Sequence, residues 1–328
     1  MIRSKIIIHV GLQKTATKYL QEVFFPRLNN VAYIGRPYTQ ENYAFNSLQY
    51  ADSSLYSVSA IGEEINRIEN EMAKGSPVLI SDELLSGFIF YNFINRGMIA
   101  ERLSKAIPDA EIVLFLRGQI DLIMSLYNQY VKLGWFDNHL DKSFLHRPGK
   151  GFPLEKWAEG ARGWNANNRF INHRSVFSPE HFRYSNIYAL YSDLFRKVHV
   201  FLYEDFRKDQ KPSLLRLASI LSTELPSEFE FDEKLQKTIV NKGLDNKQLR
   251  VQRMQNKLSH IFPAVSSRWA QMFVRGISRF APDNNDSNKT YVISLLKERD
   301  IFTDNYTLNK KLNLGMEKYR KQYFGDTV

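Results

Sequence analysis

The feature that most constrains the fold is an alternation of short apolar segments with helical patterns along residues 1–225. Mainly apolar segments recur at Lys5–Val10, Val31–Ile34, Pro77–Ile80, Glu111–Leu116 and Lys197–Tyr203. Between two of them, Ile61, Ile65, Ile68 and Met72 show the three-to-four-residue period of an amphipathic helix. Strands without polar alternation are buried on both faces. The pattern therefore predicts an α/β fold, with a parallel sheet flanked by helices.

The composition excludes several classes of protein. With 43% hydrophobic and 13% aromatic residues, the chain is too apolar to be disordered. It has no cysteine, which excludes a disulfide scaffold, a thiolate metal site and a cysteine nucleophile. Its start has a short apolar core without a small-residue cleavage site, and no apolar run is long enough for a transmembrane helix. We therefore expect a cytoplasmic protein, with the inner membrane surface as an alternative location.

The net charge of +10 is concentrated in one stretch, residues 241–280. The basic residues of this stretch are Lys242, Lys247, Arg250, Arg253, Lys257, Arg268, Arg275 and Arg279. Asp245 is the single acid there, so eight minus one gives +7. Such a block indicates an anionic partner or surface, and a solvated charged face is the ordinary alternative. Aromatic residues at helical spacing in 262–280 favour packing on the core over contact with a membrane.

Two regions depart from the strand–helix alternation. Residues 135–179 are rich in Gly, Asn, Arg, His and aromatic residues without clear periodicity, which predicts a functional insertion. Beyond Pro226 the chain becomes helical and basic. We therefore predict one domain, with an α/β core in 1–134 and 180–225, an insertion in 135–179 and a basic helical region in 226–328.

The turn after the first apolar segment has the composition of a phosphate site. It begins at Gly11 and leads into a helix, so free backbone N–H groups and the positive end of the helix dipole face the same point. Lys14 adds a charge, and Thr15 and Thr17 add hydroxyl groups. The turn lacks the Gly-Lys-Ser/Thr ending of a Walker A loop. A polar turn with a capping threonine is the structural alternative.

This turn resembles a motif of the sulfotransferases that use 3′-phosphoadenosine 5′-phosphosulfate (PAPS). Their 5′-phosphosulfate loop reads roughly P-K-[ST]-G-[ST]-[ST], and the chain has Gln13-Lys14-Thr15-Ala16-Thr17-Lys18 at the corresponding place. The lysine and both threonines match, whereas Gln13, Ala16 and Lys18 depart from the pattern. Ala16 is compatible with the pattern if the backbone there is helical. The resemblance implies that these six residues contact PAPS and that Lys14 acts in catalysis.

A second phosphate signature follows the segment Glu111–Leu116. Arg117 ends that segment, and Ser125 comes eight residues later in a predicted helix, before Tyr127 and Tyr130. An arginine fork and a helix-borne hydroxyl suit phosphate oxygens. In the family that the first motif resembles, an Arg–Ser pair at this spacing binds the 3′-phosphate. The alternative is an ion pair between Arg117 and Asp121, with Ser125 on the surface.

The candidate base lies after the segment that ends at Ile80. Asp82 and Glu83 follow it, and parallel sheets gather functional groups at the carboxyl ends of their strands. Members of the resembling family have a catalytic His or Glu at this position, so the resemblance implies that Glu83 activates the acceptor hydroxyl. Asp82 as the base and Glu83 as a helix cap stay open as alternatives. His9, at the end of the first strand, is a candidate to line the same edge.

The late basic stretch contains a possible lid. Asn241-Lys242-Gly243 resembles the family's loop over the 3′-phosphate, which implies that Lys242 and Gly243 contact the nucleotide. In the helix that follows, apolar residues from Leu249 to Ile261 predict one buried face, beside a stripe with Arg250 and Arg253. These two arginines either reach the nucleotide or stay solvated.

The resemblance of these motifs implies a P-loop-like sulfotransferase that moves a sulfuryl group from PAPS to a hydroxyl of a carbohydrate acceptor, such as a polysaccharide, oligosaccharide or glycolipid. The resemblance points to the bacterial carbohydrate type and implies that no metal takes part. The aromatic and basic residues of the insertion 135–179 suit a sugar acceptor, and we expect no nucleic-acid partner. No histidine spacing indicates a metal site. The rival functions are a P-loop kinase of nucleotides or small molecules and a non-enzymatic polyanion binder.

Overall fold

The computed structural model describes residues 4–35, 43–73, 75–88, 93, 95–134, 179–231, 244, 246–261 and 285–325. The chain forms two compact units. The first contains residues 1–118, 183–241 and 303–328, and the second contains 119–182 and 242–302. The division into core, insertion and helical region that the sequence predicts stays a prediction, since the insertion lies outside the described residues.

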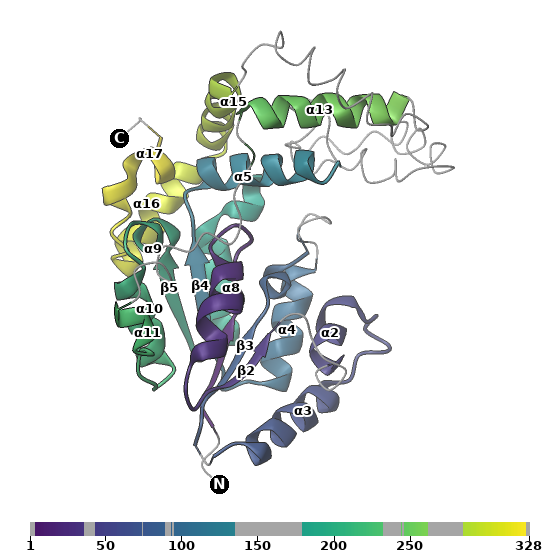
Figure 1. Ribbon diagram of the computed structural model, residues 1–328, viewed down its shortest axis with the longest axis vertical. Coiled ribbons are helices and arrows are strands. Elements are labelled where there is room, and N and C mark those ends of the chain that lie inside the picture. The colour runs from purple at the N-terminus through teal and green to yellow at the C-terminus, as the bar shows by residue number, and fades with distance from the viewer. Residues whose placement is uncertain are drawn as a thin grey trace. The chain divides into compact units, whose positions relative to one another are not determined.

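A five-stranded parallel sheet forms the centre of the first unit (Figure 1). Its strands are β1 (Ile6–His9), β2 (Ala32–Gly35), β3 (Val78–Ser81), β4 (Glu111–Leu116) and β5 (Lys197–Leu202), in the spatial order β2-β3-β1-β4-β5. Each strand lies within a residue or two of an apolar segment in the sequence. The predicted α/β fold, a parallel sheet flanked by helices, is therefore confirmed.

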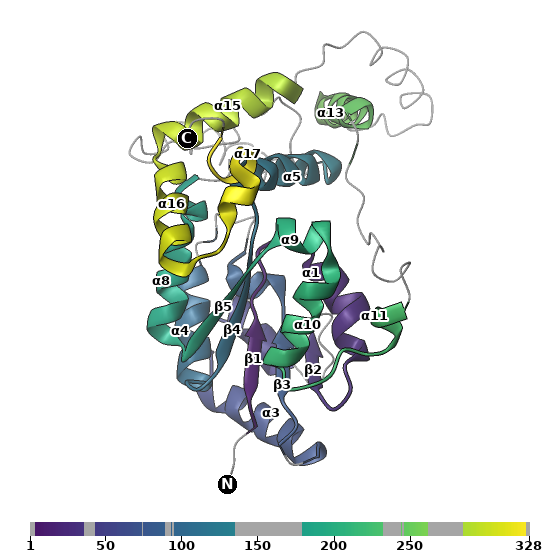
Figure 2. The ribbon, with the colours of Figure 1, turned by 90° about the vertical axis from the view of Figure 1, so that its left-hand side faces the viewer.

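Helices cover both faces of this sheet, as Figure 2 shows for α4 and α8 on one side and α10 and α11 on the other. The first face packs against α2 (Tyr43–Tyr50), α3 (Val58–Glu71), α4 (Arg96–Ala106) and α8 (Tyr184–Leu194). The second packs against α1 (Thr17–Tyr19) and its continuation to Arg27, α9 (Tyr203–Lys208), α10 (Gln210–Ile220) and α11 (Glu228–Phe231). Side chains alternate along β1: Ile8 points into the first core and Ile7 into the second.

The strand order creates a switch point between β1 and β4. From β1 the chain runs to β2 with its helix on the second face, whereas the helices leading to β4 and β5 lie on the first. In open α/β sheets, ligands bind beyond the carboxyl ends of strands at such a point. A ligand site is therefore expected at the turns after β1 and β4.

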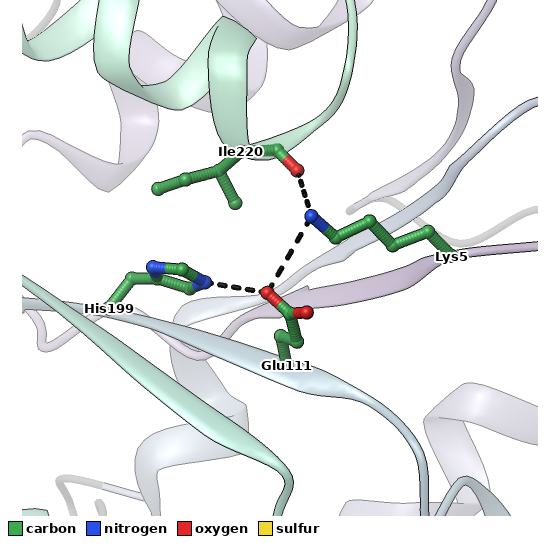
Figure 3. Close-up of polar contacts among 4 residues, drawn as sticks. All are labelled: Lys5, Glu111, His199 and Ile220. Carbon is green, nitrogen blue, oxygen red and sulfur yellow. Dashed lines mark hydrogen bonds and ion pairs between the residues drawn. The ribbon is translucent and has the colours of Figure 1, made fainter.

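A buried ionic cluster lies at the opposite, amino-terminal end of the strands (Figure 3). Glu111 begins β4, and its Oε2 lies 2.7 Å from His199 Nε2 and 3.7 Å from Lys5 Nζ. Burial would raise the pKa of Glu111, but the hydrogen bond from His199 and the charge of Lys5 outweigh it and hold the pKa below its usual value. Lys5 also donates to the Ile220 carbonyl oxygen at 2.7 Å, which ties β1 to α10.

The end of the chain returns to the first unit. Helix α16 (Ile301–Leu312) leads to a 3-10 turn, Met316–Tyr319, and then to α17 (Arg320–Tyr323). Asn305 donates a side-chain hydrogen bond to the Tyr323 carbonyl oxygen at 2.6 Å, and Tyr319 donates to Asp205 at 2.7 Å. These bonds fix the last described turn against α16 and α9.

The described part of the second unit is helical. Helices α13 (Asn246–Ile261) and α15 (Asn285–Glu298) each pack against α5 (Gln119–Lys132). The face of α13 toward α5 differs from the predicted one: Arg253 is buried and donates to the Tyr127 hydroxyl at 2.9 Å, and Asn256 donates to the Val131 carbonyl oxygen at 2.8 Å. Polar side chains with partners on α5 replace part of the expected apolar face. No helix among the described residues is long and apolar enough to cross a membrane.

Candidate active site

The turn after β1 contains three residues with a left-handed backbone conformation. Gly11, Lys14 and Ala16 take positive φ values of 52°, 68° and 65°, and helical structure begins at Thr17. Residues in the left-handed region, interspersed in a turn, direct successive N–H groups to one side, which forms a concave anion site. A phosphate loop at this turn stays a prediction, and these dihedral angles are compatible with it.

Both threonine hydroxyls of the loop face inward. Thr15 donates to the Leu12 carbonyl oxygen, and Thr17 Oγ1 lies 3.4 Å from the same atom. Both side chains are buried. In the structure these hydroxyls hold the loop closed, and their contact with a phosphate stays a prediction.

Gly11 is required by its surroundings as well as by its backbone. A Cβ atom there would lie 2.7 Å from Thr17 Oγ1, which is closer than non-bonded atoms approach. Its φ of 52° is also unfavourable for a residue with a side chain. The close approach of Gly11 to Thr17 sets the curvature of the loop.

Ala16 corrects one expectation from the sequence. The sequence predicts that alanine fits at this position, where the resembling family has glycine, if the backbone is helical. Ala16 instead has φ 65° and ψ 9°, in the left-handed region. This conformation costs an L-residue about 1–2 kcal/mol. It also gives a physical reason for glycine at this position of the motif.

Arg117 joins the loop at the carboxyl end of β4. Its Nη1 donates to the Lys14 carbonyl oxygen at 2.8 Å, and its guanidinium lies 4.6 Å from the centroid of the Tyr203 ring. The ring holds the plane of the guanidinium. Because β1 and β4 are neighbours, Arg117 of the second predicted signature contacts the turn of the first at the switch point of the sheet.

Asp82 and Glu83 follow β3, on the other side of β1. Asp82 is fully buried; its Oδ1 accepts the Leu84 N–H at 2.9 Å and its Oδ2 accepts a hydrogen bond from Gln49. It is therefore Asp82 that caps the short 3-10 turn Glu83–Ser86. Glu83 is half-buried at the first position of that turn.

Gln13 connects the candidate base to the phosphate loop. Its Nε2 donates to the carbonyl oxygens of Glu83 and Gly87, at 3.0 Å in both cases. The side chain is buried. Gln13 therefore fixes the distance between the turns after β1 and β3, a role that the sequence motif does not reveal.

His9 lies beneath the loop, in the core. Its Nδ1 and Ser81 Oγ are hydrogen-bonded at 2.8 Å, and its ring meets the rings of Phe25 and Phe115 edge to face. Gln21 donates to Ser81 Oγ at 3.2 Å and completes the network. Complete burial lowers the pKa of His9 to about 3, so the imidazole is neutral at physiological pH. His9 supports the strand ends and does not line their edge.

The remaining predicted site residues lie elsewhere or outside the described chain. Lys18 is exposed and pairs with Glu22 at 3.4 Å, one helical turn away. Ser125 is half-buried in α5, in the second unit. Lys242 and Gly243 lie outside the described residues. Among the residues that the structure does describe, no group of three acidic or histidine side chains is placed to hold a metal ion.

Two residues at this edge lie outside the predicted site. Gln49 reaches Asp82 from α2, and nothing in its local sequence marks it. Glu204, at the start of α9, accepts the Gly118 N–H at 2.9 Å and so contacts the turn that contains Arg117. In the sequence, Glu204 is marked by its position directly after a predicted strand, as Asp82 and Glu83 are.

Comparison with known proteins adds little to this geometry. No protein-family model matches the sequence, and no curated protein matches it significantly. Among solved structures, the chain is similar to the crystal structure of a sulfotransferase from Alicyclobacillus acidocaldarius. The two are 18% identical, the match covers 82% of this chain and 100% of the other, and the TM-score is 0.40. A likeness this distant says nothing about substrate or reaction.

Proposed function

We propose that the protein is a PAPS-dependent sulfotransferase acting on a hydroxyl of a carbohydrate. One observation carries the proposal: three signatures that lie far apart in the sequence meet at the carboxyl ends of three adjacent strands. Arg117 after β4 donates to the main-chain oxygen of Lys14 after β1, and Gln13 in the same loop donates to the main-chain oxygen of Glu83 after β3. A loop, a lysine, an arginine and a carboxylate at one edge provide the groups that transfer from a nucleotide requires.

The loop and Arg117 would bind the two ends of the donor. The backbone N–H groups of residues 14–17 and the Lys14 ammonium would hold the 5′-phosphosulfate, and Arg117 would hold the 3′-phosphate. Ser125 would add a hydroxyl and Lys242 and Gly243 a lid, as the resemblance implies. The donor supplies the sulfuryl group, which moves to the acceptor oxygen as its bond to the phosphate oxygen breaks.

Glu83 would accept the proton of the attacking hydroxyl, and Lys14 would neutralise the charge that develops on the leaving oxygen. The alternative base, Asp82, has its two carboxylate oxygens engaged by Leu84 and Gln49 in a fully buried position. A base must reach the proton that it abstracts. The contacts and complete burial of Asp82 therefore count against Asp82 as the base.

The carbohydrate acceptor rests on the resemblance and on the aromatic and basic composition of residues 135–179. Aromatic rings beside cations suit an anionic sugar. This segment lies outside the described residues, so the acceptor class depends on the sequence alone.

Titration calorimetry with adenosine 3′,5′-bisphosphate and with ATP tests the proposal. We expect the bisphosphate to bind without metal and to bind more tightly than ATP. Lys14→Met should weaken its binding by about tenfold or more, because a charge-assisted contact is lost. Lys105→Met, which removes an exposed lysine of α4, is the matched control and should change nothing.

Each rival function predicts a different result of this titration. Tight ATP binding that requires Mg²⁺ would favour a kinase. Steeply salt-dependent binding of polyanions, with no affinity for either nucleotide, would favour a polyanion binder. Either result from a folded sample overturns the proposal.

A further inference from the structure

A buried carboxylate connects the end of the chain to the turn that contains Arg117. Glu204 lies in the first turn of α9 and is buried. Its Oε1 accepts the backbone N–H of Gly118 at 2.9 Å, and its Oε2 accepts the hydroxyl of Tyr323 at 2.5 Å. The Glu204 carboxylate thereby links Tyr323 of α17 to Gly118, the residue after Arg117.

The backbone on either side of Arg117 is held as well. Tyr184, fully buried in α8, donates its hydroxyl to the Arg117 carbonyl oxygen and lies 3.4 Å from the Arg117 backbone nitrogen. The Tyr323 hydroxyl lies 3.3 Å from the Leu116 carbonyl oxygen. Three consecutive residues, 116 to 118, therefore each contact a buried tyrosine or carboxylate.

Close packing of α17 adds a steric constraint. A Cβ atom at Gly118 would lie 2.4 Å from Gln322 Cβ and 2.8 Å from the Gln322 carbonyl oxygen. Any side chain at position 118 would push the last helix away from the turn. Glycine at position 118 is therefore needed for α17 to pack against the turn after β4.

The hydrogen bonds on Glu204 also bear on its charge. Burial raises the pKa of Glu204, and the hydrogen bonds from Tyr323 and Gly118 oppose that effect. The charge of Arg117 opposes it further. Removal of the Tyr323 hydroxyl would leave the buried Glu204 Oε2 with one hydrogen-bond partner fewer. The free-energy cost of that loss is large enough to shift Glu204 and the turn that it holds.

We propose that Glu204 and Tyr323 are positioning residues of the anion site, which hold the backbone of Arg117 so that its guanidinium meets the 3′-phosphate. The C-terminal segment 316–324 would then act on the nucleotide site through the turn at 116–118. This inference rests on the proposed function, because it needs a bound 3′-phosphate. Small displacements of a positioned charged group have large effects on what it binds.

The test compares the affinities of two ligands, adenosine 3′,5′-bisphosphate and adenosine 5′-phosphate, for the same protein sample. The affinity for the bisphosphate divided by the affinity for the 5′-phosphate, called the ratio below, reports the contact with the 3′-phosphate. We expect Tyr323→Phe to reduce the ratio by about tenfold, the equivalent of one buried hydrogen bond. Glu204→Gln, the second variant, should reduce it in the same direction. A purely structural role would lower stability and leave the ratio unchanged, since both affinities refer to the folded protein.

Tyr319→Phe is the matched control. Tyr319 also anchors the C-terminal segment by a hydroxyl, but it donates to Asp205 and not to the turn at 116–118. Its loss should leave the ratio at the wild-type value. If the wild type binds no bisphosphate, the proposed function fails. If the wild type binds it and Tyr323→Phe and Glu204→Gln keep the wild-type ratio, this inference is wrong while the proposed function stands.

Discussion

The buried His9 should make the stability of the protein depend on pH. Burial lowers its pKa from 6.5 to about 3, so between these values the unfolded chain binds a proton that the folded chain does not. The contribution of His9 to stability is fully present above pH 6.5 and is lost as the pH falls toward 3. At pH 5, which is 1.5 pH units below the unfolded pKa of 6.5, the free energy of unfolding is lower by about 2 kcal/mol, at 1.36 kcal/mol per unit.

The substitution His9→Asn isolates this effect. Asparagine keeps a polar atom near the position of Nδ1, where Ser81 binds, and does not titrate. Urea unfolding followed by circular dichroism at pH 8 and at pH 5 gives the loss of unfolding free energy for each protein. We expect the wild type to lose about 2 kcal/mol more than the variant. His199, whose pKa burial also lowers, is present in both proteins, so its contribution cancels. Equal losses in the two proteins would refute the assignment of the proton to His9.

Four further substitutions test the site. Ala16→Gly should raise the free energy of unfolding by about 0.5–1 kcal/mol, because relief of the left-handed strain exceeds the added entropy of the unfolded chain; denaturant unfolding measures it. Gly11→Ala should lower it by more than about 1 kcal/mol in the same assay, since the new Cβ meets Thr17; an unchanged midpoint would show that the loop relaxes. Glu83→Gln should reduce sulfuryl transfer by about 10²–10⁴-fold and leave bisphosphate binding intact, whereas Asp82→Asn should mainly lower stability; an active Glu83→Gln enzyme would move the role of base elsewhere.

The sequence predicted the sheet well because each strand is marked locally. A mainly apolar segment such as Glu111–Leu116 cannot be satisfied on a surface, so its position and burial follow from its composition. The observed β4 has these same bounds. The polar turns after the strands were recognisable for a similar reason, since parallel strands bring their ends to one edge.

The contacts between those turns could not be predicted from local patterns. Gln13 bonds to Glu83 across seventy positions of sequence, and Arg117 bonds to Lys14 across 103. Nothing within a helical turn of either residue encodes its partner. The left-handed backbone of Ala16 was missed because local propensity opposes it, and the surrounding packing overrides that preference.

The second unit shows the same limit in another form. The period of α13 predicted an apolar face, but Arg253 and Asn256 are buried against α5 because Tyr127 and the Val131 carbonyl oxygen provide their partners. A buried polar residue is stable only when such partners exist. The pattern of one helix does not contain the partners that another helix supplies.

A crystal structure with adenosine 3′,5′-bisphosphate tests the central claim most directly. We predict the 5′-phosphate within hydrogen-bonding distance of the Lys14 ammonium and the backbone N–H groups of residues 14–17. We predict the 3′-phosphate against the guanidinium of Arg117. A nucleotide bound away from the carboxyl ends of β1 and β4, or with its 3′-phosphate away from Arg117, would contradict the account.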